Sequence, residues 1–247
     1  MDWPNECAMV VPCLNEGATI HSLVLESARH LPRIIVVDDG SCDQTAVRAS
    51  AAGARVIRHE ATRGKGYSIQ TGLSRAAMEG CRWALLMDGD GQHCPGDIPR
   101  FLECAERSRA ALVVGNRMGS AAAMPWVRRL ANRWMSAWLS LGLGCRLPDS
   151  QCGFRLVRLD AWLECECQGD HFEMESEMLL QFVRRGHLIA FVPVKTIYKS
   201  ERSKIRPLRD GWRWLTWCWR ATRLKSRADR LGGKPKSERR RAASPAV

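Results

Sequence analysis

The feature that most constrains the fold is an unbroken run rich in β-branched residues, Arg33 to Val37, which stops at Asp38-Asp39-Gly40-Ser41. A continuous apolar run of this length is typical of a strand covered on both faces, as in a parallel sheet. Similar short runs cover Ala8 to Val11 and Trp83 to Met87. Proline cannot donate to a sheet ladder, so Pro12 is predicted to end the first of these strands.

Helical patterns alternate with these runs. Apolar residues recur at helical spacing from Ile20 to Ser27, and no two adjacent strands read as a hairpin. The alternation predicts a βαβ series with a parallel sheet. The other predicted elements are helices over Thr45 to Ala52, Tyr67 to Met78, Trp126 to Leu141 and Met174 to Arg184, and strands over Arg55 to Ile57, Val113 to Val114, Gly153 to Val157 and Leu188 to Val192.

The net charge of +12 is concentrated near the C-terminus. Residues 203–247 hold 14 basic and 3 acidic side chains, which leaves 24 basic and 23 acidic side chains in residues 1–202. Nucleic-acid-binding proteins spread Lys and Arg over a folded face, so this distribution argues against a uniformly basic nucleic-acid coat. Eleven cysteines in a chain of 247 residues are expected to be mostly buried free thiols, as at Cys7, Cys13, Cys81 and Cys104.

No membrane span or signal peptide is expected. The longest uncharged apolar stretch, Trp134 to Cys145, has 12 residues, whereas a bilayer span needs about 20. The first residues lack a basic segment followed by an apolar one. The protein is therefore expected to stay in the cytoplasm.

Polar groups follow the predicted strands, where doubly wound sheets bind ligands. Ser41 and Asp43 also suit a turn or a helix cap, and that alternative stays open for them. Asp88-Gly89-Asp90 places two carboxylates at a strand end, which suits Mg²⁺ or Mn²⁺, although an Asp-Gly turn is the alternative. Gly64-Lys65-Gly66 lacks the P-loop frame, and no Gly-x-Gly-x-x-Gly follows the first strand. Hydride transfer and ATP hydrolysis by those routes are therefore disfavoured.

The motifs, taken in order, resemble family 2 glycosyltransferases from about residue 7 to about residue 210. The closest resemblance is to the branch of dolichyl- and undecaprenyl-phosphate sugar transferases. The segments that carry it are Val11 to Glu16, Val36 to Ser41 with Asp43 and Thr45, Arg63 to Gly66, Met87 to His93, Gly115 to Arg117, Asp149 to Arg155, Phe172 to Leu179, and Thr196 to Tyr198 with Ser203 and Lys204.

The resemblance implies a GT-A fold, which is an α/β, Rossmann-like, mostly parallel sheet with flanking helices. It implies transfer of a sugar from a nucleoside diphosphate, with inversion, at a site holding Mg²⁺ or Mn²⁺. A departing diphosphate develops negative charge that cations stabilise. Carried over by position, the donor-binding residues are Pro12, Leu14, Glu16, Val37, Asp39, Lys65, Asp88 and Gly89; the metal ligands are Asp88, Asp90 and Gln92; the phosphate-binding residues are Arg117 and Lys204; and the catalytic residues are Asp90, Arg117, Glu175 and Glu177.

The acceptor decides whether a base is needed. A polyprenyl phosphate is already anionic, whereas a hydroxyl acceptor must lose a proton to a carboxylate. If the segment is extended, Glu173, Glu175 and Glu177 all point to one side. If it is a helix, Glu173 and Glu177 come together, where like charges repel. The alternative without a function is a solvated acidic start of a helix. Related mannosyltransferases commonly carry Arg where Thr196 stands. That clamp is either absent or replaced by Lys195, Lys199 or Arg202.

The C-terminal segment adds a second expected feature. On a helical wheel, residues 208–227 align five arginines beside a face rich in tryptophan, which suits an amphipathic helix on an anionic membrane surface. A helix packed on the catalytic domain is the alternative. The expected domains are a catalytic domain over residues 1–205, the basic helix over 206–230 and a disordered tail over 231–247.

Three functions remain in competition. The leading one is a metal-dependent glycosyltransferase at the cytoplasmic membrane face that uses a nucleoside diphosphate sugar and a polyprenyl phosphate. A hydroxyl acceptor in cell-envelope or polysaccharide synthesis is the second. A nucleic-acid-binding module using the basic tail is the third, and the Asp-rich strand ends argue against it, because they would repel phosphate without a metal.

Overall fold

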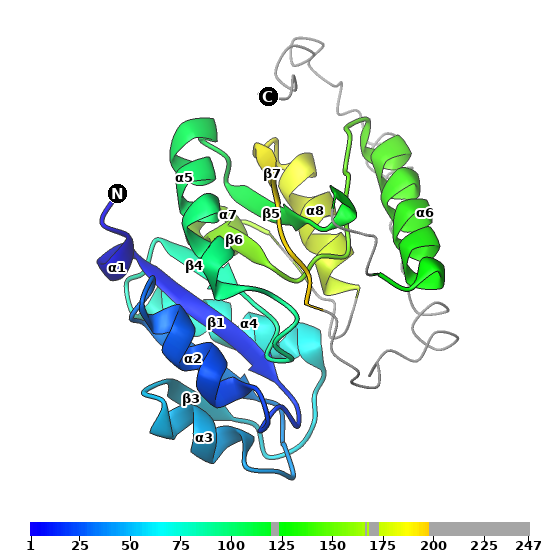
Figure 1. Ribbon diagram of the computed structural model, residues 1–247. Coiled ribbons are helices and arrows are strands. Elements are labelled where there is room, and N and C mark those ends of the chain that lie inside the picture. Colours follow the sequence, from blue (N-terminus) through cyan, green and yellow to red (C-terminus); the bar gives the residue numbers. More distant parts are fainter. Residues whose placement is uncertain (120–123, 166, 168–172, 198–247) are drawn as a thin grey trace. The chain divides into compact units, whose positions relative to one another are not determined.

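The computed structural model describes residues 1–119, 124–165, 167 and 173–197 (Figure 1). Seven strands form one mixed sheet in the order β3-β2-β1-β4-β6-β5-β7. Strand β6 runs antiparallel to both of its neighbours, and the remaining pairs are parallel. The strands are β1 (Cys7–Cys13), β2 (Ile34–Asp38), β3 (Arg55–Arg58), β4 (Trp83–Leu86), β5 (Leu112–Asn116), β6 (Arg155–Arg158) and β7 (Ile189–Pro193).

Strand β1 does not end at Pro12, so that prediction is wrong. Pro12 lies opposite Val37 in the register of β1 with β2. Alternate residues of a strand turn their backbone groups to opposite neighbours. Val10 accepts from the Met87 N–H on the β4 side, so Pro12 also turns its nitrogen to that side. Because β4 has already ended at Leu86, no ladder donor is needed there.

Helices cover the sheet and its edges. Helix α4 packs on β1, β2 and β4, and α5 packs on β5, β6 and β7. Figure 1 shows α6 next to α8. The helices are α1 (Trp3–Glu6), α2 (Ile20–Ala28), α3 (Thr45–Ala51), α4 (Lys65–Met78), α5 (Ile98–Ser108), α6 (Trp126–Leu143), α7 (Leu159–Leu163) and α8 (Met174–Arg184), with a 3-10 turn over Pro95–Asp97.

The core lies between these helices and the sheet. Every residue of β2 and β4 is buried, as the continuous apolar runs predicted. Phe101 of α5 stacks on Phe154 with ring centroids 4.1 Å apart. Cys7, Cys13 and Cys81 are buried free thiols, and Cys104 is half-buried. In the part of the chain that is described, no helix is both long and apolar enough to cross a bilayer.

Candidate functional site

The loops after β1 and β2 are tied together at the carboxyl edge of the sheet. The Asn15 N–H donates to Ser41 Oγ at 2.9 Å, and the Gly17 N–H donates to an Asp43 carboxylate oxygen at 2.9 Å. The other oxygen of Asp43 accepts from the Thr45 N–H at 2.9 Å, at the first residue of α3. Ser41 and Asp43 therefore hold the two loops together, and Asp43 also fixes the turn that leads into α3.

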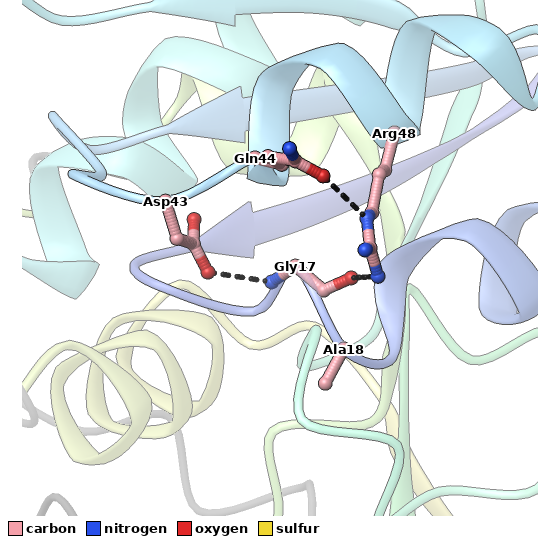
Figure 2. A pocket seen from close by; sticks show the side chains of 5 residues that line it. All are labelled: Gly17, Ala18, Asp43, Gln44 and Arg48. Atoms are coloured by element: carbon pink, nitrogen blue, oxygen red, sulfur yellow. Dashed lines mark hydrogen bonds between the residues drawn. The ribbon is translucent and has the colours of Figure 1, made fainter.

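A surface hollow lies over the same two loops (Figure 2). Its lining residues are Gly17, Ala18, Asp43, Gln44 and Arg48. Arg48 donates to the Gly17 carbonyl at 2.9 Å and to Gln44 Oε1 at 3.2 Å, so these polar groups satisfy one another. None of the predicted site residues lines this hollow, and its contacts stabilise the loops.

Asp39 is the hydrogen-bonding centre of the loop after β2. Its carboxylate is buried and accepts backbone N–H groups from Arg63 at 3.0 Å and Gly64 at 2.8 Å. His59 Nδ1 lies 2.8 Å from Asp39 Oδ1. Asp39 therefore fixes the Arg63-Gly64 turn that leads directly into Lys65 and α4.

Lys65 lies between two carboxylates from distant parts of the chain. Its Nζ is 2.8 Å from Asp88 Oδ1 and 2.7 Å from Glu175 Oε1. Burial acts to lower the pKa of Lys65, but the two carboxylates outweigh it and the pKa ends above its usual value. Burial likewise acts to raise the pKa of Asp88, but the Lys65 charge outweighs it and the pKa ends below its usual value. Lys65 and Asp88 therefore stay charged at neutral pH.

Glycines allow close approach on both sides of this cluster. A Cβ on Gly153 would fall 2.5 Å from Asp88 Oδ2, and a Cβ on Gly89 would fall 2.5 Å from Cys13 Sγ and 3.3 Å from Glu16 Cγ. The structure therefore brings the predicted donor residues Glu16, Asp88 and Gly89 together. The ends of β1 and β2 place three more of these residues at the same edge: Pro12, Leu14 and Val37.

His93 closes the cluster from the side of Phe154. Its ring is buried, with Nε2 3.9 Å from Asp88 Oδ2 and its centroid 5.2 Å from that of Phe154. Burial lowers the pKa of His93 to about 4, so the ring is neutral at pH 7. The Ile197 N–H donates to the Gln92 carbonyl at 2.9 Å, which holds the segment after β7 against this loop.

Asp88 and Asp90 fit a divalent cation that is shared with a substrate. Both carboxylates lie in one loop, and Mg²⁺ and Mn²⁺ prefer such hard oxygen ligands. The Gln92 N–H donates to Asp90 Oδ1 at 3.0 Å and shapes the loop. Among the described residues, no three His, Cys, Asp or Glu side chains are grouped as in an all-protein metal cage. A cation at these two aspartates would complete its coordination with phosphate oxygens and water.

Arg117 follows β5 and pairs with Asp149. Its Nε and Nη2 contact the two carboxylate oxygens at 2.8 and 2.9 Å, and its backbone N–H donates at 3.1 Å. Burial acts to raise the pKa of Asp149, but the hydrogen bonds and charge of Arg117 outweigh it and the pKa ends below its usual value. Asn132 of α6 donates to the same carboxylate at 2.9 Å. A phosphate at Arg117 would therefore share the guanidinium with Asp149.

Glu175 and Glu177 lie in the first turn of α8 and are buried, with exposures of 4% and 9%. The solvated acidic helix start is therefore wrong, as is the extended segment. The first turn of α8 is also held by Arg155, which is fully buried. Its guanidinium donates to the backbone carbonyls of Glu175, Cys152 and Ser150 at 2.6, 2.7 and 2.9 Å. Arg155 thus fixes both the start of α8 and the loop before β6.

Sequence reasoning missed three residues that hold predicted site residues in place: Asp149 and Asn132 beside Arg117, and Arg155 beside Glu175. Arg155 and Asp149 stood in a quoted motif but had no assigned role, and Asn132 carried no sequence signal beyond its place in a helical pattern. Lys204 and the segment 208–227 lie outside the described residues, so the phosphate and membrane contacts predicted for them stay predictions.

Comparison with known proteins identifies relatives of the chain. The family model described as glycosyl transferase family 2 matches residues 8–160. An uncharacterized protein of Methanocaldococcus jannaschii is 32% identical over 203 residues, covering 78% of this chain and 82% of that protein. The UDP-N-acetylglucosamine–dolichyl-phosphate N-acetylglucosaminyltransferase of Methanococcus voltae is 29% identical, covering 77% of this chain and 85% of that enzyme.

Two further proteins show the same similarity. The undecaprenyl-phosphate mannosyltransferase of Micrococcus luteus is 29% identical, covering 77% of this chain and 83% of that enzyme. Among solved structures, glucosyl-3-phosphoglycerate synthase from Mycobacterium tuberculosis, in complex with Mn²⁺ and UDP-glucose, superimposes with a TM-score of 0.66 at 25% identity. That match covers 80% of this chain and 72% of the synthase.

Proposed function

The chain belongs to glycosyl transferase family 2 and is a glycosyltransferase, and from that premise we propose that it transfers a sugar from a nucleoside diphosphate to a polyprenyl phosphate. Relatives named for dolichyl-phosphate and undecaprenyl-phosphate transfer support this acceptor class. The observation on this chain that carries the proposal is the bridge of Lys65 between Asp88 and Glu175, because it joins the donor edge of the sheet to the start of α8.

The donor would bind at the ends of β1, β2 and β4. Asp39 fixes the turn under the nucleoside, and Gly89 leaves room for the loop beside Glu16. Asp88 and Asp90, with Gln92 as the third group, would hold Mg²⁺ or Mn²⁺, which supplies positive charge to the diphosphate. The solved synthase structure in complex with Mn²⁺ and UDP-glucose supports a divalent metal together with a nucleotide sugar as the donor state.

In the reaction, an acceptor phosphate oxygen attacks the anomeric carbon. The bond from that carbon to the diphosphate oxygen breaks, the electron pair leaves with the nucleoside diphosphate, and the configuration inverts. The Lys65 ammonium lies between Asp88 and Glu175, at the junction of the two sides, and would contact a diphosphate oxygen there. Arg117 and Lys204 would contact phosphate oxygens as the negative charge moves.

The state of Glu175 favours a phosphate over a hydroxyl acceptor. A hydroxyl needs a carboxylate to take its proton. Glu175 Oε1 is 2.7 Å from the Lys65 ammonium, and accepting a proton would break that ion pair. A phosphate acceptor needs no base, so Glu175 and Glu177 can act as positioning groups. The hydroxyl acceptor remains the second candidate.

Placement at the cytoplasmic membrane face belongs to the same proposal. A polyprenyl phosphate is confined to a bilayer, so an enzyme that acts on it must reach the headgroup level. The proposed domains are the catalytic domain over residues 1–205, a basic amphipathic helix over 206–230 and a basic tail over 231–247. The helix and tail are argued from sequence alone.

The test is sugar transfer by the purified full-length chain. Labelled UDP- and GDP-sugars are incubated with undecaprenyl phosphate in detergent with Mn²⁺, and the lipid product is extracted. We expect Asp90→Ala to lose at least about a thousandfold in turnover, because the diphosphate loses its cation. Glu26→Ala, an exposed carboxylate on α2, is the matched control and should transfer normally. Metal-dependent transfer by folded Asp90→Ala would refute the assignment. Salt-sensitive DNA or RNA binding without any donor turnover would favour the nucleic-acid alternative.

A further inference from the structure

Helix α6 carries its polar side inward. Its buried residues are Asn132, Ser136 and Leu139. Asn132 donates to Asp149 at 2.9 Å, and Ser136 Oγ lies 3.1 Å from Ser150 Oγ and accepts the Ser150 N–H at 2.9 Å. The hydrogen-bonding side of this helix is thus occupied by the loop that pairs with Arg117.

The opposite side of α6 is apolar and exposed. Five large apolar side chains define this α6 outer face: Trp126 (70% exposed), Val127 (57%), Leu130 (61%), Trp134 (54%) and Leu141 (85%). At about 100° per residue they fall within an arc of about 100°. Five of the twelve large exposed apolar side chains in the described residues lie on this one helix, so the face is a patch and not scattered surface.

Positive charge borders the α6 outer face. The 18 residues of α6 contain three arginines and no acidic side chain. On the same wheel, Arg133 and Arg129 lie about 20° and about 60° beyond the Trp126 edge, and both side chains are exposed. Arg128 lies past the opposite edge of the arc. An apolar arc with tryptophan and bordering arginines matches the boundary between acyl chains and anionic headgroups.

We propose that the α6 outer face docks onto an anionic lipid bilayer, with the helix lying in the plane of the surface. The helix is not long and apolar enough to cross a bilayer, and its apolar face beside a basic edge is typical of helices that lie along the interface. The absence of any acidic side chain on α6 complements anionic lipid. A protein partner of the same shape would need acidic groups around an apolar groove, whereas a bilayer supplies both chemistries over any area.

This surface deepens the proposed function and rests on it for its purpose. Asn132, on the inner side of α6, donates to Asp149, and Asp149 accepts two hydrogen bonds from the Arg117 guanidinium. Docking of the outer face therefore places the Arg117 end of the site one helix diameter from the headgroups. A lipid-linked phosphate could reach Arg117 there without leaving the membrane.

The experiment is flotation of the full-length protein with vesicles of phosphatidylcholine, with and without phosphatidylglycerol. The variants are Trp126→Gln with Trp134→Gln, and Arg129→Gln with Arg133→Gln. We expect the first pair to lower partitioning at least about tenfold, because apolar area no longer leaves water. The second pair should lose about thirtyfold on anionic vesicles only, at about 1 kcal/mol for each cation. Val47→Gln with Met78→Gln, exposed apolar residues on other helices, is the matched control and should bind like the wild type.

Two outcomes would overturn the proposal. If the Trp126→Gln, Trp134→Gln variant partitioned onto vesicles as the wild type does, membrane binding would belong to another part of the chain, such as residues 206–230. A change from dimer to monomer by light scattering, with vesicle binding unaltered, would make the α6 outer face a contact between two copies. Thermal stabilisation by UDP or GDP with Mn²⁺ is measured on the same samples. Vesicle binding through α6 without any nucleotide stabilisation would refute the proposed function and leave the docking surface in place.

Discussion

Gly153→Ala displaces the Asp88 carboxylate without removing it. The added Cβ would fall 2.5 Å from Asp88 Oδ2, 2.8 Å from Oδ1 and 2.9 Å from Cγ. The carboxylate belongs to a side chain and can move, whereas Gly153 is buried in the loop that enters β6. The backbone of Gly153 does not lie in the left-handed region, so alanine itself is not strained there.

The size of the effect follows from the displacement. To return from 2.5 Å to an ordinary contact of 3.4 Å, Asp88 Oδ2 must move by about 0.9 Å. That movement changes the 2.8 Å contact with Lys65 and the position of a metal ligand. A misplacement of about 1 Å in a reacting site costs on the order of a hundredfold in rate. We therefore expect kcat/KM to fall about a hundredfold, while the free energy of unfolding changes by less than about 1 kcal/mol.

The assay compares initial transfer rates and urea unfolding of the wild type and the variant. Gly96→Ala is the matched control, because its Cβ would meet only Cys94 Sγ at an ordinary 3.5 Å. The control should keep wild-type kcat/KM. Folded Gly153→Ala with a rate within about twofold of wild type would show that the position of the Asp88 carboxylate does not matter, and the reasoning would fail.

Three further predictions concern stability. Asp149→Ala leaves the Arg117 guanidinium without its bidentate partner and should cost about 3–5 kcal/mol in urea unfolding; a loss below about 1 kcal/mol would contradict this. Gly72→Ala places a Cβ 2.2 Å from Val10 Cγ1 and should cost about 1–3 kcal/mol, part of which Val10→Ala should restore in the double variant. His93 has a folded pKa of about 4 against an ordinary 6.5, so the unfolded state binds more protons between these values. In metal-free protein, stability should therefore fall as pH is lowered through that window, by up to about 3 kcal/mol, and His93→Asn should flatten the profile; parallel profiles would contradict the burial argument.

The sheet was largely predictable because buried strands leave a strong local signal. The continuous apolar runs at β2 and β4 are typical of strands covered on both faces, and both strands are fully buried. The antiparallel orientation of β6 was not predictable, because strand direction depends on the neighbour and not on the residues of the strand. The prediction that Pro12 ends its strand failed for a similar reason. The missing N–H of a proline breaks a ladder only where a neighbouring strand offers an acceptor, and β4 offers none opposite Pro12.

The site was predictable as residue types but not as pairings. Asp88 and Asp90 stand out because carboxylates at a strand end require compensation. The compensating partner of Asp88, Lys65, is 23 positions away in sequence, and Glu175, the other partner of Lys65, is farther still. Local spacing cannot show which charges meet across a sheet edge. The burial of Glu175 and Glu177 could not be predicted for the same reason. The sequence of an acidic first turn is the same whether the turn faces water or packs beside Arg155.

Helix α6 shows how far periodicity can take a prediction. The spacing of tryptophan and leucine predicted a helix over Trp126 to Leu141, and the structure contains one. A hydrophobic stripe usually faces the core, and on that rule the side with Trp126 and Trp134 would be buried. Here Asn132 and Ser136 face inward, because their hydrogen bonds to Asp149 and Ser150 satisfy the loop that carries the Arg117 partner. The same helix therefore satisfies a polar loop on one side and leaves an apolar face on the other. Contact with a second apolar medium would remove the area of that face from water, which is the driving force for the proposed docking.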